Sequence, residues 1–249
     1  MIINIPTYDG SGQIVHPSIL KKDGYYWMAY TPYPYNNRKF ENPSLVVSKD
    51  GINWKRPGGL TNPIVKPPEE GHYCDPYITF HIVYNYYFAW HSALKTTHKH
   101  SILYRMNSLD GIKWSKPEVV FDRLNQFIMS PCVIGEDMWY VVMDAYTRKI
   151  RAFKNWMPIQ LQPNPWHLEV RFHKDRYIML YNTESFKILY AESFDGLSWA
   201  VRSEPLLDPS YKASFLVEDK FKVWYSHRKE GTAKWVAKYE TFESPIRLS

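Results

Sequence analysis

One short phrase occurs three times in the chain, and it constrains the fold more than any other feature. The copies read SKDGINW at residues 48–54, SLDGIKW at 108–114 and SFDGLSW at 193–199. Each copy follows a run of β-forming residues, and Asp-Gly between two such runs predicts a hairpin with a tight type I′ turn, because that turn needs positive φ angles. The Trp three residues after each Gly is expected on the outgoing strand, where its ring covers the seam between units. Self-similarity at a period of roughly 20–50 residues indicates a propeller or a solenoid.

A second pattern extends the repeat to five units. Each unit begins with a polar residue, followed by one intervening residue, another side chain and an apolar run. The copies begin at His16, Asp75, Ser130, His167 and Lys212. An aromatic strand follows in every unit, at residues 25–30, 86–90, 138–143, 177–181 and 221–225. Three or four antiparallel strands per unit, repeated around a ring, predict an all-β fold: a five-bladed β-propeller that forms a single domain over residues 1–249. Residues 2–5 are expected to complete the fifth blade and close the ring.

Composition and charge exclude several classes of partner. The formal net charge is +6, but Lys and Arg are scattered singly, so nucleic-acid binding is not expected. There is no signal-peptide pattern and no apolar run of membrane-spanning length, so we expect no membrane partner and a cytoplasmic or phage-associated location. Cys74 and Cys132 show no metal-ligand spacing and are predicted to be reduced thiols in strands. The sequence carries no signal of oligomeric state.

The unit starts predict two rings of side chains in a central channel. The first strand of each propeller blade lines the channel, and strand side chains alternate with period two. The first residues of the units therefore form one ring, and the residues two positions later form a deeper ring, consisting of Ser18, Tyr77, Cys132, Glu169 and Ser214. Unpaired buried charges are costly, so carboxylates, imidazoles and an amine on one axis indicate a functional site. In the alternative, structural interpretation, Glu169 pairs with Lys212 or Arg171 inside the channel.

With the Ser-x-Asp-Gly-x-x-Trp hairpins between them, these strand starts resemble those of the five-bladed propeller glycosidases. That superfamily contains glycoside hydrolase families 43, 62, 32, 68 and 130, and the chain is most similar to an uncharacterised bacterial and phage branch. The resemblance implies hydrolysis of a poly- or oligosaccharide by paired carboxylates at the channel. The family 43 pattern has Asp on blade one, Asp on blade two and Glu on blade three. Only the blade-two residue matches, as Asp75, because His16 and Ser130 occupy the other two positions.

Asp75 and Glu169, from blades two and four, are therefore the expected catalytic pair, in an acid–base order that the sequence leaves open. Loops at residues 32–42, 67–73, 94–101 and 148–162 are expected to wall the pocket. The expected substrate-binding residues are His16, His167, Lys212, Glu41, Ser130, His91 and Trp166.

Two other functions stay open. A non-catalytic carbohydrate-binding propeller, for example on a phage particle, is consistent with Ser18 and Ser130 at positions where carboxylates are expected. A phosphate-dependent glycoside phosphorylase is consistent with His16, His167 and Lys212 as a cationic cradle. A sialidase is disfavoured, because Asp and Gly are adjacent in the repeated phrase and no Arg begins a unit.

No cofactor and no resident metal are expected. A channel cation such as calcium stays open, because His16, Asp75, His167 and Glu169 are metal-ligand residue types. No local spacing of these residues supports a metal site.

Overall fold

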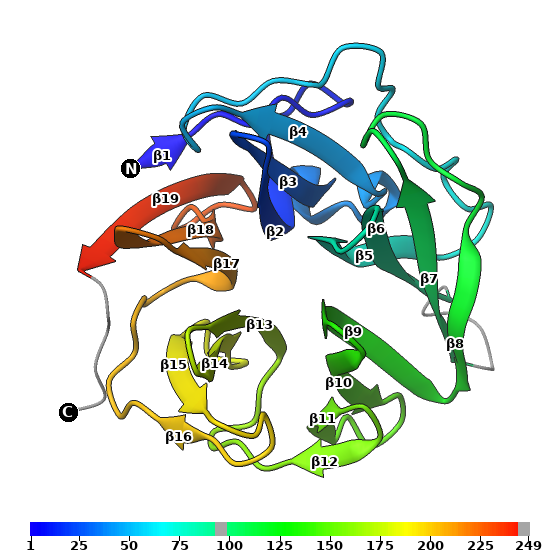
Figure 1. Ribbon diagram of the computed structural model, residues 1–249. Helices are drawn as coiled ribbons and strands as arrows, with labels where there is room; N and C mark the ends of the chain where they lie inside the picture. Colours follow the sequence, from blue (N-terminus) through cyan, green and yellow to red (C-terminus); the bar gives the residue numbers. More distant parts are fainter. Residues whose placement is uncertain (93–98, 244–249) are drawn as a thin grey trace.

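The computed structural model describes residues 1–92 and 99–243, which form five antiparallel sheets arranged around a central axis (Figure 1). Each sheet is one blade of three or four strands. The predicted all-β, five-bladed propeller is therefore confirmed. Within the described residues, no helix has the length and apolar character needed to cross a membrane.

The blades follow one another along the chain. Blade one contains β2 (Ile14–Lys22), β3 (Tyr25–Pro32) and β4 (Ser44–Ser48), with the short 3₁₀ turns η1 (Pro34–Asn36) and η2 (Arg38–Phe40) before β4. Blade two contains β5 (His72–Phe80), β6 (Tyr84–His91), β7 (His100–Ser108) and β8 (Glu118–Leu124). Blade three contains β9 (Gln126–Ile134), β10 (Asp137–Asp144), β11 (Ile150–Lys154) and β12 (Met157–Ile159). Blade four contains β13 (His167–His173), β14 (Arg176–Asn182), β15 (Ile188–Ser193) and β16 (Ala200–Val201). Blade five contains β17 (Tyr211–Val217), β18 (Lys220–Arg228), β19 (Trp235–Glu243) and β1 (Ile2–Ile3).

The N-terminal strand closes the ring, as the sequence predicts. In β1, Ile2 and Ile3 pair with Lys238 and Ala237 of β19, so the fourth strand of blade five comes from the opposite end of the chain. The amino group of Met1 also donates to the backbone carbonyl of Tyr239 at 2.7 Å. The edge of β19 is thereby paired instead of presenting free backbone groups.

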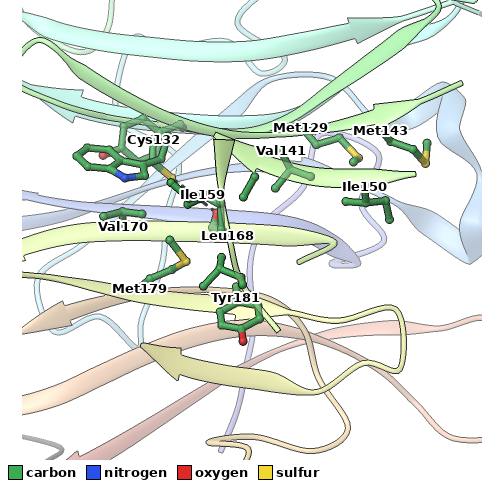
Figure 2. Packing of buried hydrophobic residues seen from close by; sticks show 14 of the residues in the cluster. Met129, Cys132, Val141, Met143, Ile150, Ile159, Leu168, Val170, Met179 and Tyr181 are labelled. Atoms are coloured by element: carbon green, nitrogen blue, oxygen red, sulfur yellow. Dashed lines mark hydrogen bonds between the residues drawn. The ribbon is translucent and has the colours of Figure 1, made fainter. Parts of the chain in front are cut away.

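The hydrophobic core lies between neighbouring blades. Figure 2 shows the seam between blades three and four, where Met129 and Val141 of one blade pack against Leu168 and Met179 of the other. These four side chains are at most 4% exposed. The innermost strands of the five blades, β2, β5, β9, β13 and β17, lie around the central axis (Figure 1). These strands carry buried polar side chains, namely His16, Asp75, Ser130, His167 and Lys212.

The Asp-Gly phrases do not form the predicted type I′ turns. That turn needs positive φ at both central residues, but only Gly51 is left-handed in the first copy, with φ +77°, and Asp50 is not. Asp50 instead stabilises the turn through Oδ1, which accepts the backbone N–H groups of Ile52 and Asn53 at 2.9 and 2.8 Å. The other two copies repeat these bonds. The prediction of turn type was wrong because a carboxylate that accepts backbone N–H groups favours a different, Asx-type turn.

The repeated phrase does contribute to the seams, as expected, but Trp54, Trp114 and Trp199 lie just outside the outgoing strands on which they were predicted. Trp54, which follows the turn and donates its Nε1–H to the carbonyl of Gly51, packs in the cluster between blades one and five. A second Trp completes the seam: the ring of Trp224 from β18 lies against Gly51 and donates to the same carbonyl at 2.7 Å. Trp139 makes both contacts with Gly196, whereas Trp27 packs against Gly111 without a hydrogen-bond partner for its Nε1 among the described residues. The Gly of the phrase is therefore required both for its φ angle and for the space that a neighbouring indole occupies.

Candidate active site

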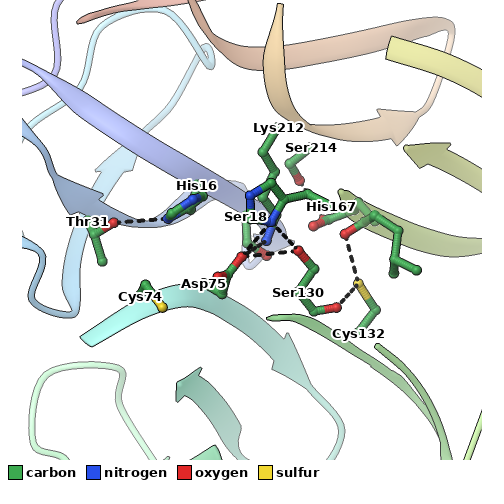
Figure 3. Close-up of polar contacts among 12 residues, drawn as sticks. His16, Ser18, Thr31, Cys74, Asp75, Ser130, Cys132, His167, Lys212 and Ser214 are labelled. Atoms are coloured by element: carbon green, nitrogen blue, oxygen red, sulfur yellow. Dashed lines mark hydrogen bonds and ion pairs between the residues drawn. The ribbon is translucent and has the colours of Figure 1, made fainter. Parts of the chain in front are cut away.

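The first strands of blades one, two and three contain the same backbone bend. His16, Asp75 and Ser130, each followed by Pro, have φ angles of +56°, +50° and +51°. At each of them the register between the first and second strands of the blade shifts, which marks a β-bulge. A left-handed conformation costs a non-glycine residue about 1–2 kcal/mol, and such bulges re-aim side chains near functional sites. The bend turns all three side chains toward the centre of the ring (Figure 3).

Asp75 lies at the centre of the resulting polar cluster. One of its carboxylate oxygens, Oδ1, accepts a hydrogen bond from Ser130 Oγ at 3.1 Å and lies 2.9 Å from His167 Nδ1 and 3.7 Å from Lys212 Nζ. Burial alone would raise the pKa of Asp75, but His167, His16 and Lys212 outweigh it and hold this pKa well below its usual range. Asp75 is therefore an ionised carboxylate. The other four residues of the predicted ring contact it or lie beside it.

His16 and His167 are neutral imidazoles that share a phenol. Their ring centroids lie 4.8 Å apart, and Nε2 of His167 and of His16 lies 2.6 and 3.3 Å from Tyr211 Oη. Trp166 Nε1 donates to the same oxygen at 3.3 Å, so at least one imidazole must accept the Tyr211 proton. Burial lowers the pKa of both histidines, and Lys212 lowers it further, although Asp75 opposes the shift. A neutral imidazole has one ring-nitrogen lone pair, so the histidine that accepts from Tyr211 must give up that hydrogen bond before it binds a proton or a metal ion.

Glu41 adds a second carboxyl group of opposite protonation state. It follows η2, is buried, and lies with Oε2 3.8 Å from His16 Nδ1. Burial raises the pKa of Glu41 well above its usual range, and the nearby charge of Asp75 raises it further, whereas Arg38 lowers it. Two carboxyl groups whose pKa values are pushed apart, one protonated and one ionised, are typical of acid–base catalysis.

A cavity of about 230 Å³ opens over this cluster. The sequence-predicted residues that line it are His16, Glu41, Asp75, His91, Trp166 and His167. Ser130 and Lys212 do not line the cavity. Both contact Asp75 inside the channel, and the two residues are only 0% and 1% exposed to solvent. Of the loops expected to wall the pocket, residues 32–42, 67–73 and 148–162 each contribute a lining side chain, namely Glu41, His72 and Arg148 among others. Most of the fourth loop, residues 94–98, lies outside the described residues.

Glu169 does not line this cavity. It belongs to the deeper ring, where its Oε1 accepts hydrogen bonds from Ser214 Oγ at 2.6 Å and from Arg171. Its side chain is fully buried, and Arg171 also donates to the backbone carbonyl of Ile19. The structural interpretation of Glu169, an ion pair with Arg171 inside the channel, therefore describes its observed contacts.

Tyr211, His72 and Cys74 are among the cavity-lining residues that were not identified from the sequence as site residues. Tyr211 directly precedes Lys212, but its importance depends on a hydroxyl group that reaches two other blades. His72 and Cys74 lie on the same side of β5, two residues apart, and a His-x-Cys spacing in a strand was the one available signal. Both cysteines are free and buried in strands, as predicted, with Cys132 in β9.

Two groups of side chains in the described part of the chain have the geometry to hold a metal ion. His16, Asp75 and His167 each offer a ligand atom, and these atoms lie within 4.8 Å of one another; the same holds for His72, Cys74 and His91. An ionised carboxylate with two neutral imidazoles fits a divalent transition metal. It does not fit calcium, which takes oxygen ligands, so the calcium left open by the sequence is disfavoured.

No family model matches the chain. A curated relative, the A type blood N-acetyl-alpha-D-galactosamine deacetylase of Flavonifractor plautii, is 33% identical over 128 residues, which cover 48% of this chain and 16% of that protein. The match thus spans less than a fifth of the relative's length.

Solved structures match nearly the whole chain. The crystal structure of an N-acetylgalactosamine deacetylase from F. plautii, in complex with blood group B trisaccharide, has a TM-score of 0.79 at 19% identity, covering 97% of this chain and 94% of that chain. The fold is that of the five-bladed propeller glycosidases. A thermostable family-43 glycoside hydrolase matches with a TM-score of 0.65 at 15% identity, covering 94% of this chain and 91% of that one. The GH43_1 enzyme from Xanthomonas citri, complexed with xylose, matches with a TM-score of 0.66 at 12% identity, covering 95% and 89%. The resemblance to this glycosidase superfamily is therefore confirmed at the level of fold.

Proposed function

We propose that this protein is a carbohydrate-active hydrolase that removes the acetyl group from an N-acetylated amino sugar in an oligo- or polysaccharide. The observation that carries the proposal is the convergence of His16, Asp75 and His167 in one cavity beside Glu41, a buried carboxyl group with a raised pKa. The proposal is also supported by the deacetylase of F. plautii, which is similar both in sequence and in structure.

Hydrolysis of the amide can be written with these groups. A divalent metal ion held by His16, Asp75 and His167 would supply a Lewis acid that polarises the carbonyl and lowers the pKa of water. Water adds to the carbonyl carbon, the C–N bond breaks, and Glu41 donates its proton to the departing nitrogen. The Glu41 carboxylate left by this donation then takes the extra proton of the added water, so that Glu41 is restored and the products are acetic acid and the free amino sugar.

The surrounding residues keep the site in this state. Lys212 and Ser130 hold Asp75 ionised and oriented from below. Tyr211 fixes the imidazole of His167 through its other ring nitrogen, the arrangement that orients histidine ligands in metal sites. Trp166 in turn fixes the Tyr211 hydroxyl.

Glycoside hydrolysis is the second candidate, because Asp75 and Glu41 provide an ionised and a protonated carboxyl group on one cavity. This pairing differs from the sequence-based pair Asp75 and Glu169. Glu169 would first have to leave Arg171 and Ser214 to reach a substrate.

The two candidates release different products from the same substrates. The protein is incubated with N-acetylhexosamine oligosaccharides, and acetate, new reducing ends and substrate mass are measured. The proposal predicts acetate release that a chelator abolishes. New reducing ends without acetate would instead support a glycosidase or, if phosphate were required, a phosphorylase. Glycan binding without any product would support the binding module.

Matched variants connect the activity to the site. Asp75→Asn and Glu41→Gln are each expected to lower acetate release about 100-fold or more, the usual contribution of one acid–base group. Asp122→Asn, on the outer strand β8, keeps full activity. Full activity of Asp75→Asn would refute the proposed chemistry.

A further inference from the structure

A second cluster of metal-ligating side chains lies at one corner of blade two and has no part in the chemistry proposed above. His72 and Cys74 lie two residues apart on β5, so their side chains leave the strand on the same side. His91, the last residue of β6, is the direct cross-strand partner of His72. Three ligand-type side chains thus converge from a single hairpin.

The distances within this cluster match tetrahedral metal coordination. Cys74 Sγ lies 3.5 Å from His91 Nδ1, and one ligand atom from each of the three residues lies within 4.8 Å of the others. With typical Zn–S and Zn–N bonds of about 2.3 and 2.0–2.1 Å, tetrahedral angles place the sulfur and nitrogen about 3.5 Å apart. Cys74 Sγ also lies 3.8 Å from His91 Nε2, so the sulfur is almost equidistant from the two ring nitrogens and does not lie along the Nδ1 lone pair. Binding of one ion by both residues therefore requires the His91 ring or the Cys74 side chain to turn.

The backbone holds His91 in the tautomer that binding requires. Its Nε2 lies 3.0 Å from the carbonyl oxygen of Ile128. A carbonyl only accepts hydrogen bonds, so Nε2 carries the proton and Nδ1, the nitrogen nearer Cys74, keeps its lone pair. A histidine ligand fixed by a backbone carbonyl through its second nitrogen is the usual arrangement in protein metal sites.

The residue before His72 allows the two histidines to approach. Gly71 has φ +76°, and a Cβ there would lie 2.1 Å from the carbonyl oxygen of His91. Any other residue would push the start of β5 away from the end of β6. The close approach that pairs His72 with His91 therefore depends on glycine at this position.

The cluster lines the same cavity as the group around Asp75 and is its direct neighbour, because Cys74 precedes Asp75 and its thiol also hydrogen-bonds to the Asp75 side chain. His72, Cys74 and His91 all line the cavity, so a fourth coordination position would open into it, as in catalytic zinc sites. Burial, together with the neighbouring Asp75 carboxylate, raises the pKa of the Cys74 thiol. A bound cation reverses this balance, because a coordinating thiol is deprotonated outright.

We propose that His72, Cys74 and His91 bind a thiophilic divalent metal ion, Zn²⁺, with the fourth position open to the cavity. The donor set is one thiolate and two imidazoles, which suits zinc and excludes the hard cations magnesium and calcium. This site is independent of the proposed deacetylase activity, because it is defined by metal binding alone.

Cobalt(II) substitution tests the site directly. Co²⁺ is titrated into metal-free protein, and a thiolate-to-cobalt charge-transfer band is measured in the near ultraviolet; this band requires a Cys–Co bond. The wild-type protein is expected to show the band at one equivalent of thiolate-bound Co²⁺, and Zn²⁺ is expected to displace it. Absence of the band from the wild-type protein would overturn the proposal without any variant.

Two cysteine variants provide the matched comparison. Cys74→Ser is expected to abolish the band, and Cys132→Ser, at the other buried cysteine, is expected to keep it. His91→Gln is expected to weaken Co²⁺ binding at least tenfold, which gives a second measurement if Cys74→Ser does not fold. His167→Gln, in the other group of ligands, is expected to keep the band. A band that survives Cys74→Ser, or that is lost in Cys132→Ser or His167→Gln, contradicts a separate thiolate site.

Discussion

Gly196→Ala tests whether packing between blades is the reason that each copy of the repeated phrase contains Gly. Gly196 has φ +71°, and a Cβ there would lie 2.7 Å from Cζ2 of Trp139, which is fully buried on the neighbouring blade. The left-handed conformation costs alanine about 1–2 kcal/mol. Overpacking against the indole adds about 1–3 kcal/mol. If the indole moves, its 2.9 Å hydrogen bond to the Gly196 carbonyl is also lost, at about 1 kcal/mol. The variant should therefore lose about 3–6 kcal/mol of its free energy of unfolding.

Gly135→Ala is the matched control for the conformational cost. Gly135 lies in the exposed turn between β9 and β10, has φ +61° and has no atom within 4 Å of an added Cβ. Its substitution should cost only the left-handed strain of about 1–2 kcal/mol. Equilibrium denaturation in urea, with a common m-value, measures both losses. Equal destabilisation of the two variants would show that the contact with Trp139 has no effect and would refute the packing argument.

Two further predictions concern charged groups away from the cavity. Glu218 accepts hydrogen bonds from Lys21 and Lys222, and these bonds lower its pKa to about 2 although burial opposes the shift. Its contribution to stability is therefore present above the unfolded-state pKa and is lost as the pH falls toward 2. The stability difference between the wild-type protein and Glu218→Gln should therefore shrink between pH 6 and pH 2 in chemical denaturation, and a constant difference would count against it. Glu169→Gln should destabilise the protein by about 3–5 kcal/mol, because Arg171 then lies in the channel without a compensating charge. A Glu169→Gln variant with wild-type stability and no turnover would instead support the catalytic role predicted from the sequence.

The ring of strand starts was predictable because its signal repeats. His16, Asp75 and Ser130 each precede a proline in the same register, and that register could be set against the hairpin phrase. Local sequence patterns of this kind reflect local backbone geometry, which one blade determines by itself. The five-bladed fold, the closing strand at residues 2–5 and the meeting of the ring residues at Asp75 all follow from it.

The features of the site that the sequence did not predict depend on contacts between strands and between blades. Glu169 shares the side of β13 with His167, but its depth in the channel and its bond to Arg171 decide its environment, and alternation along a strand does not report depth. Glu41 becomes buried only because the segment before β4 folds over the channel mouth. His72 and His91 become neighbours through strand register, nineteen positions apart in the sequence, which no spacing rule for metal ligands describes.

The first strands of blades one to three carry an imidazole, a carboxylate and a hydroxyl group on the same backbone bend, at His16, Asp75 and Ser130. The bend therefore does not depend on which of these side chains it carries. A single codon change at one such position exchanges a functional group at the channel mouth while the proline after it and the blade around it stay the same. In evolution, different side chains can therefore replace one another at these ring positions. A propeller of this kind can change its reaction by point substitution while its fold stays the same.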